Sequence, residues 1–256
     1  MNKIAAAFRN KKALVAFITG GDPDIETTER LIHAMVEAGV DLVELGIPFS
    51  DPVAEGPVIE AASARALESG TTVDQLFHMV TRVRETIQIP IVFLSYANPI
   101  FAYGTERFMT RAAESGIDGI IVPDIPFEEK GEFAEACAKY GIAQISLIAP
   151  TSEDRIEKIA REAEGFLYCV SSLGTTGARD QIDMDMAAMV QQAKGVTDIP
   201  CAIGFGITTP ELAKRMAHLS DGVIVGSAIV RLIGKFGRNS VEPVRQFVKS
   251  IKAALS

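Results

Sequence analysis

The fold is decided by a unit of helix and strand that runs through residues 26–45, ETTERLIHAMVEAGVDLVEL. Glu26–Ala38 has apolar residues at helical spacing and predicts an amphipathic helix, and Gly39 directly after it is typical of a left-handed helix end. Asp41–Leu45 is a short run dominated by apolar residues, which is typical of a parallel strand buried on both faces. A helix followed so closely by a buried strand indicates an α/β fold.

This unit recurs along the whole chain. Further short runs rich in isoleucine and valine predict the strands Ala13–Ile18, Ile91–Ser95, Gly119–Val122, Ala143–Ile148, Phe166–Val170, Cys201–Ile203 and Gly222–Val225. Amphipathic segments between them predict helices, among which are Thr72–Ile87, Glu128–Lys139, Glu153–Glu162 and Pro210–His218. The turn from helix to strand is weakly repeated as Ala38-Gly39-Val40-Asp41, Ser115-Gly116-Ile117-Asp118 and Tyr140-Gly141-Ile142-Ala143.

Eight strand–helix units in 256 residues predict a closed (β/α)8 TIM barrel with an extra N-terminal helix. We find no linker or charge block that would divide the chain, so residues 1–256 are expected to form a single domain. A doubly wound open sheet is the alternative, but Gly204-Phe205-Gly206 lacks the third glycine of a dinucleotide-binding fingerprint. In a barrel, the chemistry is expected at the carboxyl ends of the strands.

The composition excludes several classes of partner. The chain has 25 Lys and Arg against 33 Asp and Glu, a net charge of −8, which argues against nucleic acid and anionic membranes. Phosphate ligands are not excluded, because backbone N–H groups can bind them. Three cysteines without Cys-x-x-Cys spacing favour reduced thiols in a cytoplasmic protein, and no apolar stretch is long enough to span a membrane.

Carboxylates gather where the second strand ends. Glu44 lies within the apolar strand itself, and Asp51 and Glu55 follow in a loop of prolines and glycines. A carboxylate in an apolar barrel mouth should have a raised pKa, which suits it to proton transfer near neutral pH. Glu44 could instead pair with a buried arginine, and the other two could be turn or helix-cap residues.

The last two strands predict a phosphate site. They lead into Gly204-Phe205-Gly206 and Gly226-Ser227, where glycines allow the backbone to approach a ligand. Ser227 opens a predicted helix whose free N–H groups and dipole favour an anion. Two ordinary glycine turns are the alternative. The sixth strand leads into Ser171–Gln181, a long polar loop that suits a mobile lid, or else a plain surface loop.

Residues missing from the strand ends are also informative. His33, His78 and His218 all fall in predicted helices, so no histidine metal site is expected at the mouth. No lysine ends a strand, which disfavours a Schiff-base aldolase or a pyridoxal phosphate enzyme. These observations favour a phosphorylated substrate and proton transfer by carboxylates, without a cofactor in this chain.

Glu44-Leu45-Gly46-Ile47-Pro48-Phe49-Ser50-Asp51-Pro52 resembles the signature of the tryptophan synthase α subunit family. Similar matches follow the other strands, at Gly21-Asp22-Pro23, Tyr96-Ala97-Asn98-Pro99, Pro123-Asp124-Ile125-Pro126, Gly174-Thr175-Thr176-Gly177-Ala178-Arg179, Gly204-Phe205-Gly206-Ile207 and Gly226-Ser227-Ala228. The resemblance implies a (β/α)8 barrel and retro-aldol cleavage of indole-3-glycerol phosphate to indole and glyceraldehyde 3-phosphate.

The resemblance also implies roles for individual residues. Glu44 takes the place of the catalytic glutamate, and Glu55 takes the place of a second catalytic carboxylate that accepts the indole N–H. The expected substrate-binding residues are Phe17, Leu94 and Phe205 around the indole, Tyr168, the lid residue Thr176, and Gly177, Gly204, Gly206, Gly226 and Ser227 near the phosphate.

Two positions depart from the family pattern. The family has an aspartate where this chain has Glu55, which keeps the charge on an arm one methylene longer. Ser172 stands where some members have arginine. A catalytically weak subunit that mainly activates a partner is therefore a second hypothesis. An indole-glycerol-phosphate synthase would call for a lysine at a strand end, and a sugar-phosphate epimerase for histidines and a metal.

The resemblance finally implies a partner. The family delivers indole through a tunnel to a β subunit that carries pyridoxal phosphate, in an assembly of two α and two β chains. The loops after the second and third strands would form the partner interface, with Pro48, Asp51, Asn98 and Pro99.

Overall fold

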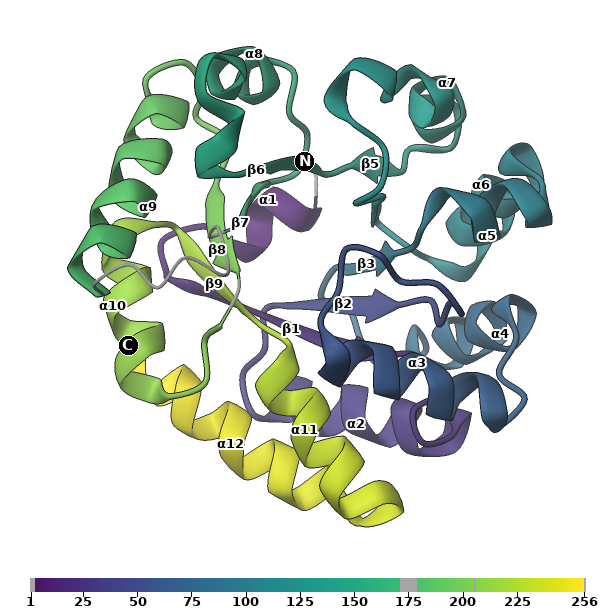
Figure 1. The fold of residues 1–256 in the computed structure, drawn as a ribbon. Helices are drawn as coiled ribbons and strands as arrows, with labels where there is room; N and C mark the ends of the chain where they lie inside the picture. The colour runs from purple at the N-terminus through teal and green to yellow at the C-terminus, as the bar shows by residue number, and fades with distance from the viewer. Residues whose placement is uncertain (1–2, 171–178, 205, 256) are drawn as a thin grey trace.

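The computed structural model describes residues 3–170, 179–204 and 206–255. All its strands run parallel, in the order β5-β4-β3-β2-β1-β9-β8-β7-β6. They are β1 (Ala13–Thr19), β2 (Leu42–Gly46), β3 (Ile91–Leu94), β4 (Gly119–Ile121), β5 (Ala143–Gln144), β6 (Ser146–Ile148), β7 (Leu167–Val170), β8 (Cys201–Gly204) and β9 (Gly222–Val225). Because only Ile145 separates β5 from β6, the two ends of this order meet and the sheet closes into a barrel (Figure 1).

The predicted barrel is thus confirmed and the open sheet is wrong, with one difference. The predicted strand Ala143–Ile148 is two short strands. Its first part pairs with β4 and its second part with β7, so Ile145 is where the strand changes partner. The Ile145 N–H still donates to the Ile120 carbonyl oxygen, at 2.9 Å. Beyond that bond the hydrogen-bonded ladder between β4 and its neighbour ends.

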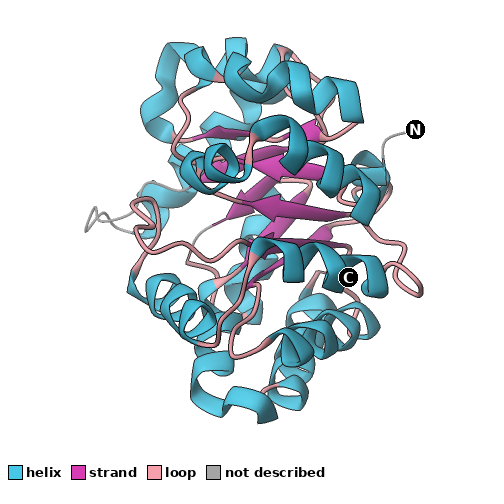
Figure 2. Cartoon of the chain, turned by 90° about the vertical axis from the view of Figure 1, so that its right-hand side faces the viewer, coloured by secondary structure: helices cyan, strands magenta, loops and turns pink. Residues whose placement is uncertain are grey.

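Helices surround the strands on all sides (Figure 2). The α-helices are α1 (Lys3–Ala7), α2 (Ile25–Glu37), α3 (Pro57–Glu68), α4 (Val73–Val83), α5 (Ala97–Tyr103), α6 (Thr105–Ser115), α7 (Gly131–Tyr140), α8 (Ile156–Arg161), α9 (Arg179–Lys194), α10 (Pro210–Leu219), α11 (Ser227–Phe236) and α12 (Val241–Ala254). Short 3-10 helices are η1 (Phe127–Glu129), η2 (Pro150–Arg155) and η3 (Gly237–Asn239). The predicted helices Glu128–Lys139 and Glu153–Glu162 each begin with one of these 3-10 segments.

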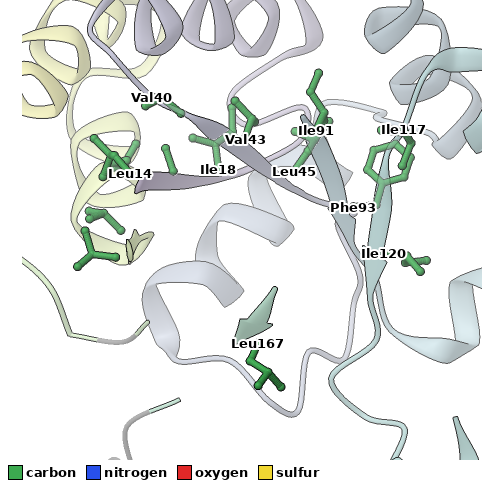
Figure 3. Packing of buried hydrophobic residues seen from close by; sticks show 14 of the residues in the cluster. Leu14, Ile18, Val40, Val43, Leu45, Ile91, Phe93, Ile117, Ile120 and Leu167 are labelled. Atoms are coloured by element: carbon green, nitrogen blue, oxygen red, sulfur yellow. The ribbon is translucent and has the colours of Figure 1, made fainter. Parts of the chain in front are cut away.

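Side chains alternate between the inside and the outside of the barrel. The outer side chains pack against the helices, as Leu14, Val43, Leu45 and Phe93 do in Figure 3. The inner side chains form a separate cluster with α1, which includes Ile4, Phe8, Val15, Leu42, Val92, Ile121, Phe166 and Ile224. The interior of the barrel is therefore a packed core at the end nearest to α1.

Helix α1 covers the amino ends of the strands. A side chain on Gly119, the first residue of β4, would lie against Ile4, and one on Gly222, the first residue of β9, would lie against Phe8. The Phe8 ring also packs on Phe166, with 5.5 Å between ring centroids. The predicted extra helix is present, and it closes the end of the barrel opposite the strand ends that were expected to carry function.

Two of the three repeated helix-to-strand turns end in an aspartate, and the turn before β9 also ends in one. Asp41, Asp118 and Asp221 each precede a strand, and each accepts a backbone N–H from the start of the neighbouring strand, namely that of Leu14, Ile91 or Cys201. Each carboxylate is also paired with a basic side chain, Lys11 and Lys252 for Asp41, Arg84 for Asp118 and Lys194 for Asp221. These three aspartates therefore tie adjacent strands together at the amino end of the barrel.

Two further expectations concern the chain as a whole. Within the described part of the chain, no helix has both the length and the apolar character needed to cross a membrane. Cys137, Cys169 and Cys201 are free and buried.

Candidate active site

A cavity of about 510 Å³ opens at the carboxyl ends of the strands. Its lining includes eight of the residues that the sequence predicted for the site, Phe17, Glu44, Glu55, Leu94, Tyr168, Gly206, Gly226 and Ser227. They come from β1, β2, β3, β7 and the segments that follow β2, β8 and β9. Strands and loops that are far apart in the sequence therefore meet at one place, as the barrel prediction required.

Glu44 lies in the wall of this cavity, on the inner face of β2. Its register partners on the neighbouring strands are Phe17 and Val92, both apolar. The side chain is buried, and neither carboxylate oxygen has a hydrogen-bond partner among the described residues. Burial, together with the nearby charge of Glu55, raises the pKa of Glu44 to about 8. Among the described residues Glu44 therefore has no ion-pair partner, so they do not support the alternative of a buried pair with arginine.

Glu55 is the second carboxyl group of the cavity and is half-buried. Burial, and then the negative charge of Glu60, raises its pKa to about 7. Glu55 precedes α3 by two residues, so its position depends on the loop between β2 and α3. Two carboxyl groups whose protonation changes near neutral pH are therefore present in one cavity.

Tyr96 holds the loop that carries Glu55. The backbone N–H of Ala54 donates to the Tyr96 hydroxyl oxygen at 2.9 Å. The Tyr96 ring also packs on Phe49, at the beginning of the same loop, with 5.4 Å between centroids. Burial, and then the charge of Glu55, raises the pKa of Tyr96 to about 12. Sequence reasoning did not single out this tyrosine as a site residue, although it quoted it within a motif.

Helix α3 is anchored separately. Arg65 makes two hydrogen bonds to the buried carboxylate of Asp22, at 2.8 and 2.7 Å, and so ties α3 to the turn after β1. Val58 and Ile59 on the first turns of α3 line the cavity. Because paired arginine–carboxylate bonds fix orientation as well as distance, this contact sets how α3 faces the cavity.

Tyr168 forms part of the opposite wall, and burial raises its pKa well above the ordinary value. Gly204, on the neighbouring strand, is not among the residues that line the cavity. A Cβ atom there would lie 2.5 Å from the Tyr168 ring, so this glycine leaves room for the tyrosine. Gly204 was predicted to bind substrate, whereas the structure places it beside the Tyr168 ring and not in the described lining of the cavity.

The end of the cavity near α11 is suited to an anion. Gly226 is the N-cap of α11, and Ser227 is its first residue. The free N–H groups and the dipole of this helix end favour negative charge. Arg231, one helical turn after Ser227, also lines the cavity and adds a positive charge. Sequence reasoning missed Arg231; its spacing of four residues from Ser227 on a predicted helix is the signal that could have found it.

The residues predicted for the partner interface lie at the rim. Asp51 and Asn98 are exposed, Pro99 is partly exposed, and Pro48 is buried, so Pro48 can act on a partner only through the shape of the loop. Asn98 and Pro99 lie on helix α5 and not in a loop, because Asp124 accepts the N–H of Ala97 and caps this short helix. Val53 and Phe101 are exposed apolar side chains on the same two segments.

Some predicted residues lie outside the described part of the chain. They are Ser172, Thr176, Gly177 and Phe205. The predicted lid, Ser171–Gln181, lies mostly there as well. Its last three residues belong to helix α9, which begins at Arg179, so the loop is shorter than the sequence suggested.

Comparison with known proteins identifies the family. A sequence model of the tryptophan synthase alpha chain matches residues 4–255. The chain belongs to this family. A tryptophan synthase alpha chain from Thermoanaerobacter sp. is 47% identical over 262 residues and covers all of both chains. The one from Lacticaseibacillus casei is also 47% identical, over 255 residues, all of this chain and 96% of that one.

Solved structures agree with the assignment to the tryptophan synthase alpha chain family. Tryptophan synthase subunit alpha from Legionella pneumophila superposes with a TM-score of 0.91 at 37% identity, over 100% of this chain and 98% of that one. A chain of the tryptophan synthase complex from Pyrococcus furiosus superposes with a TM-score of 0.87 at 33% identity, over 95% and 98%. Membership confirms the predicted fold and the predicted activity, the lyase half-reaction that cleaves indole-3-glycerol phosphate.

Proposed function

We propose that Glu44 and Glu55 carry out this cleavage as a pair of proton-transfer groups. The observation that carries the proposal is the state of Glu44, which is buried in the cavity wall with neither oxygen hydrogen-bonded among the described residues and with its pKa raised to about 8. At neutral pH such a group is mostly protonated. It is therefore ready to donate a proton as a general acid.

In the first step, Glu44 donates its proton to C3 of the indole ring while Glu55, as a carboxylate, accepts the N1 proton. The ring becomes an indolenine with a tetrahedral C3, and Glu44 becomes a carboxylate. A negative charge near N1 stabilises this step, because positive charge develops on the nitrogen as C3 is protonated.

In the second step, Glu44 removes the proton of the glycerol hydroxyl next to C3. The C–O bond becomes the aldehyde, the bond from this carbon to C3 breaks, and its electrons restore the aromatic ring. Glu55 returns the proton to N1. Both carboxyl groups then have their starting protonation, and indole and glyceraldehyde 3-phosphate are the products.

Binding of the substrate is assigned to the rest of the cavity. Phe17, Leu94 and Tyr168 supply flat and branched surfaces that suit the indole ring. Gly206, Gly226 and Ser227, at the end next to α11, would bind the phosphate. The cavity thus combines apolar walls with a helix N-terminus, which suits a substrate that is aromatic at one end and doubly charged at the other. Thr176, Gly177 and Phe205 remain expected contributors.

The test is Glu44→Gln, which removes the proton at nearly constant volume. General acid–base catalysis is worth about 100-fold to 10,000-fold, so kcat at saturating substrate should fall by at least about 100-fold. Glu68→Gln, on the exposed end of α3, is the matched control and should leave kcat unchanged. A loss below about tenfold in the Glu44 variant would remove this residue from the role.

We also propose that the chain works with a β subunit that carries pyridoxal phosphate, as two α and two β chains. The exposed set Asp51, Val53, Asn98, Pro99 and Phe101 at the rim supports this proposal, because apolar and rigid segments lose little entropy on docking. Docking there would order the loop that bears Glu55. We therefore expect the isolated chain to cleave its substrate slowly and the partner to accelerate it. Asp51→Ala should blunt this acceleration and keep the slow basal rate. An equal loss of both rates would contradict this coupling.

The same expectation extends to the location of the protein. Its three free, buried thiols support a reducing compartment, and we propose the cytoplasm. Detection of the chain in an oxidising compartment, by fractionation, would contradict this.

A further inference from the structure

The strand change at Ile145 leaves an opening in the wall of the barrel. β4 pairs with β5 only through Gly119 and Ile120, and β6 pairs only with β7. Past Ile145, no strand ladder joins β4 to β6 among the described residues. The opening also lies between two groups of helices. η1 and α7 are on one side of it and η2 and α8 on the other, at the top of Figure 1.

A second cavity, of about 340 Å³, fills this opening. We call it the side cavity. Its floor is apolar and includes Ile125, Phe127, Ile148 and Ile159. Pro123, Leu147 and Val170 line both the side cavity and the cavity that contains Glu44. The two cavities are therefore direct neighbours.

The rim of the side cavity is charged but balanced. Lys130 is paired with Glu162 at 2.5 Å, and Arg155 is paired with Glu128 at 3.5 Å. Both pairs cross from one side of the opening to the other, because Glu128 and Lys130 flank α7 while Arg155 and Glu162 flank α8. Since Lys130 and Arg155 each have a carboxylate, the described lining of the cavity offers no unpaired positive charge to an anion. A neutral, apolar ligand is favoured over a phosphorylated one.

We propose that the side cavity is a second binding site for a neutral bicyclic aromatic molecule, and that its occupant is the indole released in the neighbouring cavity. The choice of indole rests on the proposed function; the existence of the site rests on the opening, the apolar floor and the paired rim. Indole has room in the cavity, and both exposed ion pairs that cross its rim are weak enough to open as it enters. The site would hold product next to the cavity in which it forms.

The test is a titration of the full chain with indole, followed by methyl NMR of isoleucine-labelled protein. Ile125, Ile148 and Ile159 line only the side cavity, and Ile59, Ile207 and Ile224 line only the other one. Both sets should shift and saturate, the first with a dissociation constant of about a millimolar, as befits a ligand of nine heavy atoms. Glycerol 3-phosphate should shift only the second set. Shifts confined to the second set with indole would overturn the proposal.

Two variants make the assignment independent of catalysis. Ser146→Phe adds a ring to the β6 wall of the side cavity and should abolish the shifts of Ile148 and Ile159 while those of Ile59 remain. Thr151→Phe places a ring on an exposed position outside the cavity and should change neither set. Unchanged indole shifts of Ile148 in a folded Ser146→Phe protein would refute the site. Glu44→Gln should bind indole at both sites. Binding at the side cavity can therefore be judged even if the proposed cleavage mechanism is wrong.

Discussion

The hydroxyl of Tyr96 and the backbone N–H of Ala54 are 2.9 Å apart and join two segments that follow different strands. This bond fixes the residue directly before Glu55, so it sets where the second carboxyl group stands. Tyr96→Phe keeps the ring contact with Phe49 and removes only the acceptor. We expect kcat to fall by about three- to tenfold, the effect of one lost hydrogen bond, with little change in stability. Crystal structures or loop NMR should show greater mobility at Ala54; an unchanged kcat would mean that the loop is held without this bond.

The two carboxyl groups predict a bell-shaped dependence of rate on pH. The proposed first step needs Glu44 protonated and Glu55 ionised, and their pKa values are raised to about 8 and about 7. The rate should fall below about pH 7 as Glu55 gains its proton and above about pH 8 as Glu44 loses its own. Because the groups interact, the two limbs report the pair as a whole. A rate that keeps rising from pH 6 to pH 9 would contradict the assignment.

The role of Glu55 can be tested by changing the length of its side chain. Glu55→Asp shortens the arm by one methylene to the family residue and should keep activity within about tenfold. Glu55→Ala removes the charge that stabilises the indolenine and should lower kcat by about 100-fold or more. Glu60→Gln is a useful companion because the Glu60 charge contributes to the raised pKa of Glu55. It should move the acid limb of the rate profile to lower pH without abolishing the rate.

The buried carboxyl group also predicts how stability depends on pH. The pKa of Glu44 is higher in the folded chain than in the unfolded chain, so the folded chain holds its proton more tightly. The associated stabilisation is full below the unfolded pKa, near 4.5, and is lost as pH rises through about 8. Glu44→Gln cannot ionise and should therefore unfold at a higher denaturant concentration than the parent at pH 8.5. The difference in free energy should reach about 3–5 kcal/mol there and vanish near pH 4.5.

The close approach of Gly204 to Tyr168 leads to a prediction about the shape of the cavity. Gly204→Ala places a methyl group 2.5 Å from the Tyr168 ring, so the tyrosine must move into the cavity. We expect a loss of about 1–3 kcal/mol in stability and a higher KM for the substrate. Gly131→Ala adds the same methyl group at the start of α7, where nothing lies within 4 Å, and should change neither quantity. An unchanged KM in the Gly204 variant would show that the ring has space to shift elsewhere.

The barrel could be predicted because its strands are short and mostly apolar and several of the segments between them are amphipathic. The break at Ile145 could not be predicted, because only Gln144 and Ser146 interrupt the apolar residues of Ala143–Ile148, a pattern that a single strand also has, and the change of partner depends on how the ring closes. Glu44 was found because a carboxylate inside an apolar strand is costly without a purpose. Tyr96 was missed because its importance comes from contacts with a distant segment, the loop of Phe49 and Ala54. Arg231 was missed although its spacing from Ser227 places both on one side of a predicted helix. Gly204 was recognised by type, but its contact with Tyr168 lies across two strands and leaves no local pattern.

The position of α1 has a consequence for molecular traffic. Ile4 and Phe8 pack against the first residues of the strands, so the amino end of the barrel is closed. Water, substrate and product therefore do not pass through the amino end of the barrel. A protein or loop that covers the carboxyl ends of the strands can limit what enters and leaves the cavity there, without a second closure at the amino end.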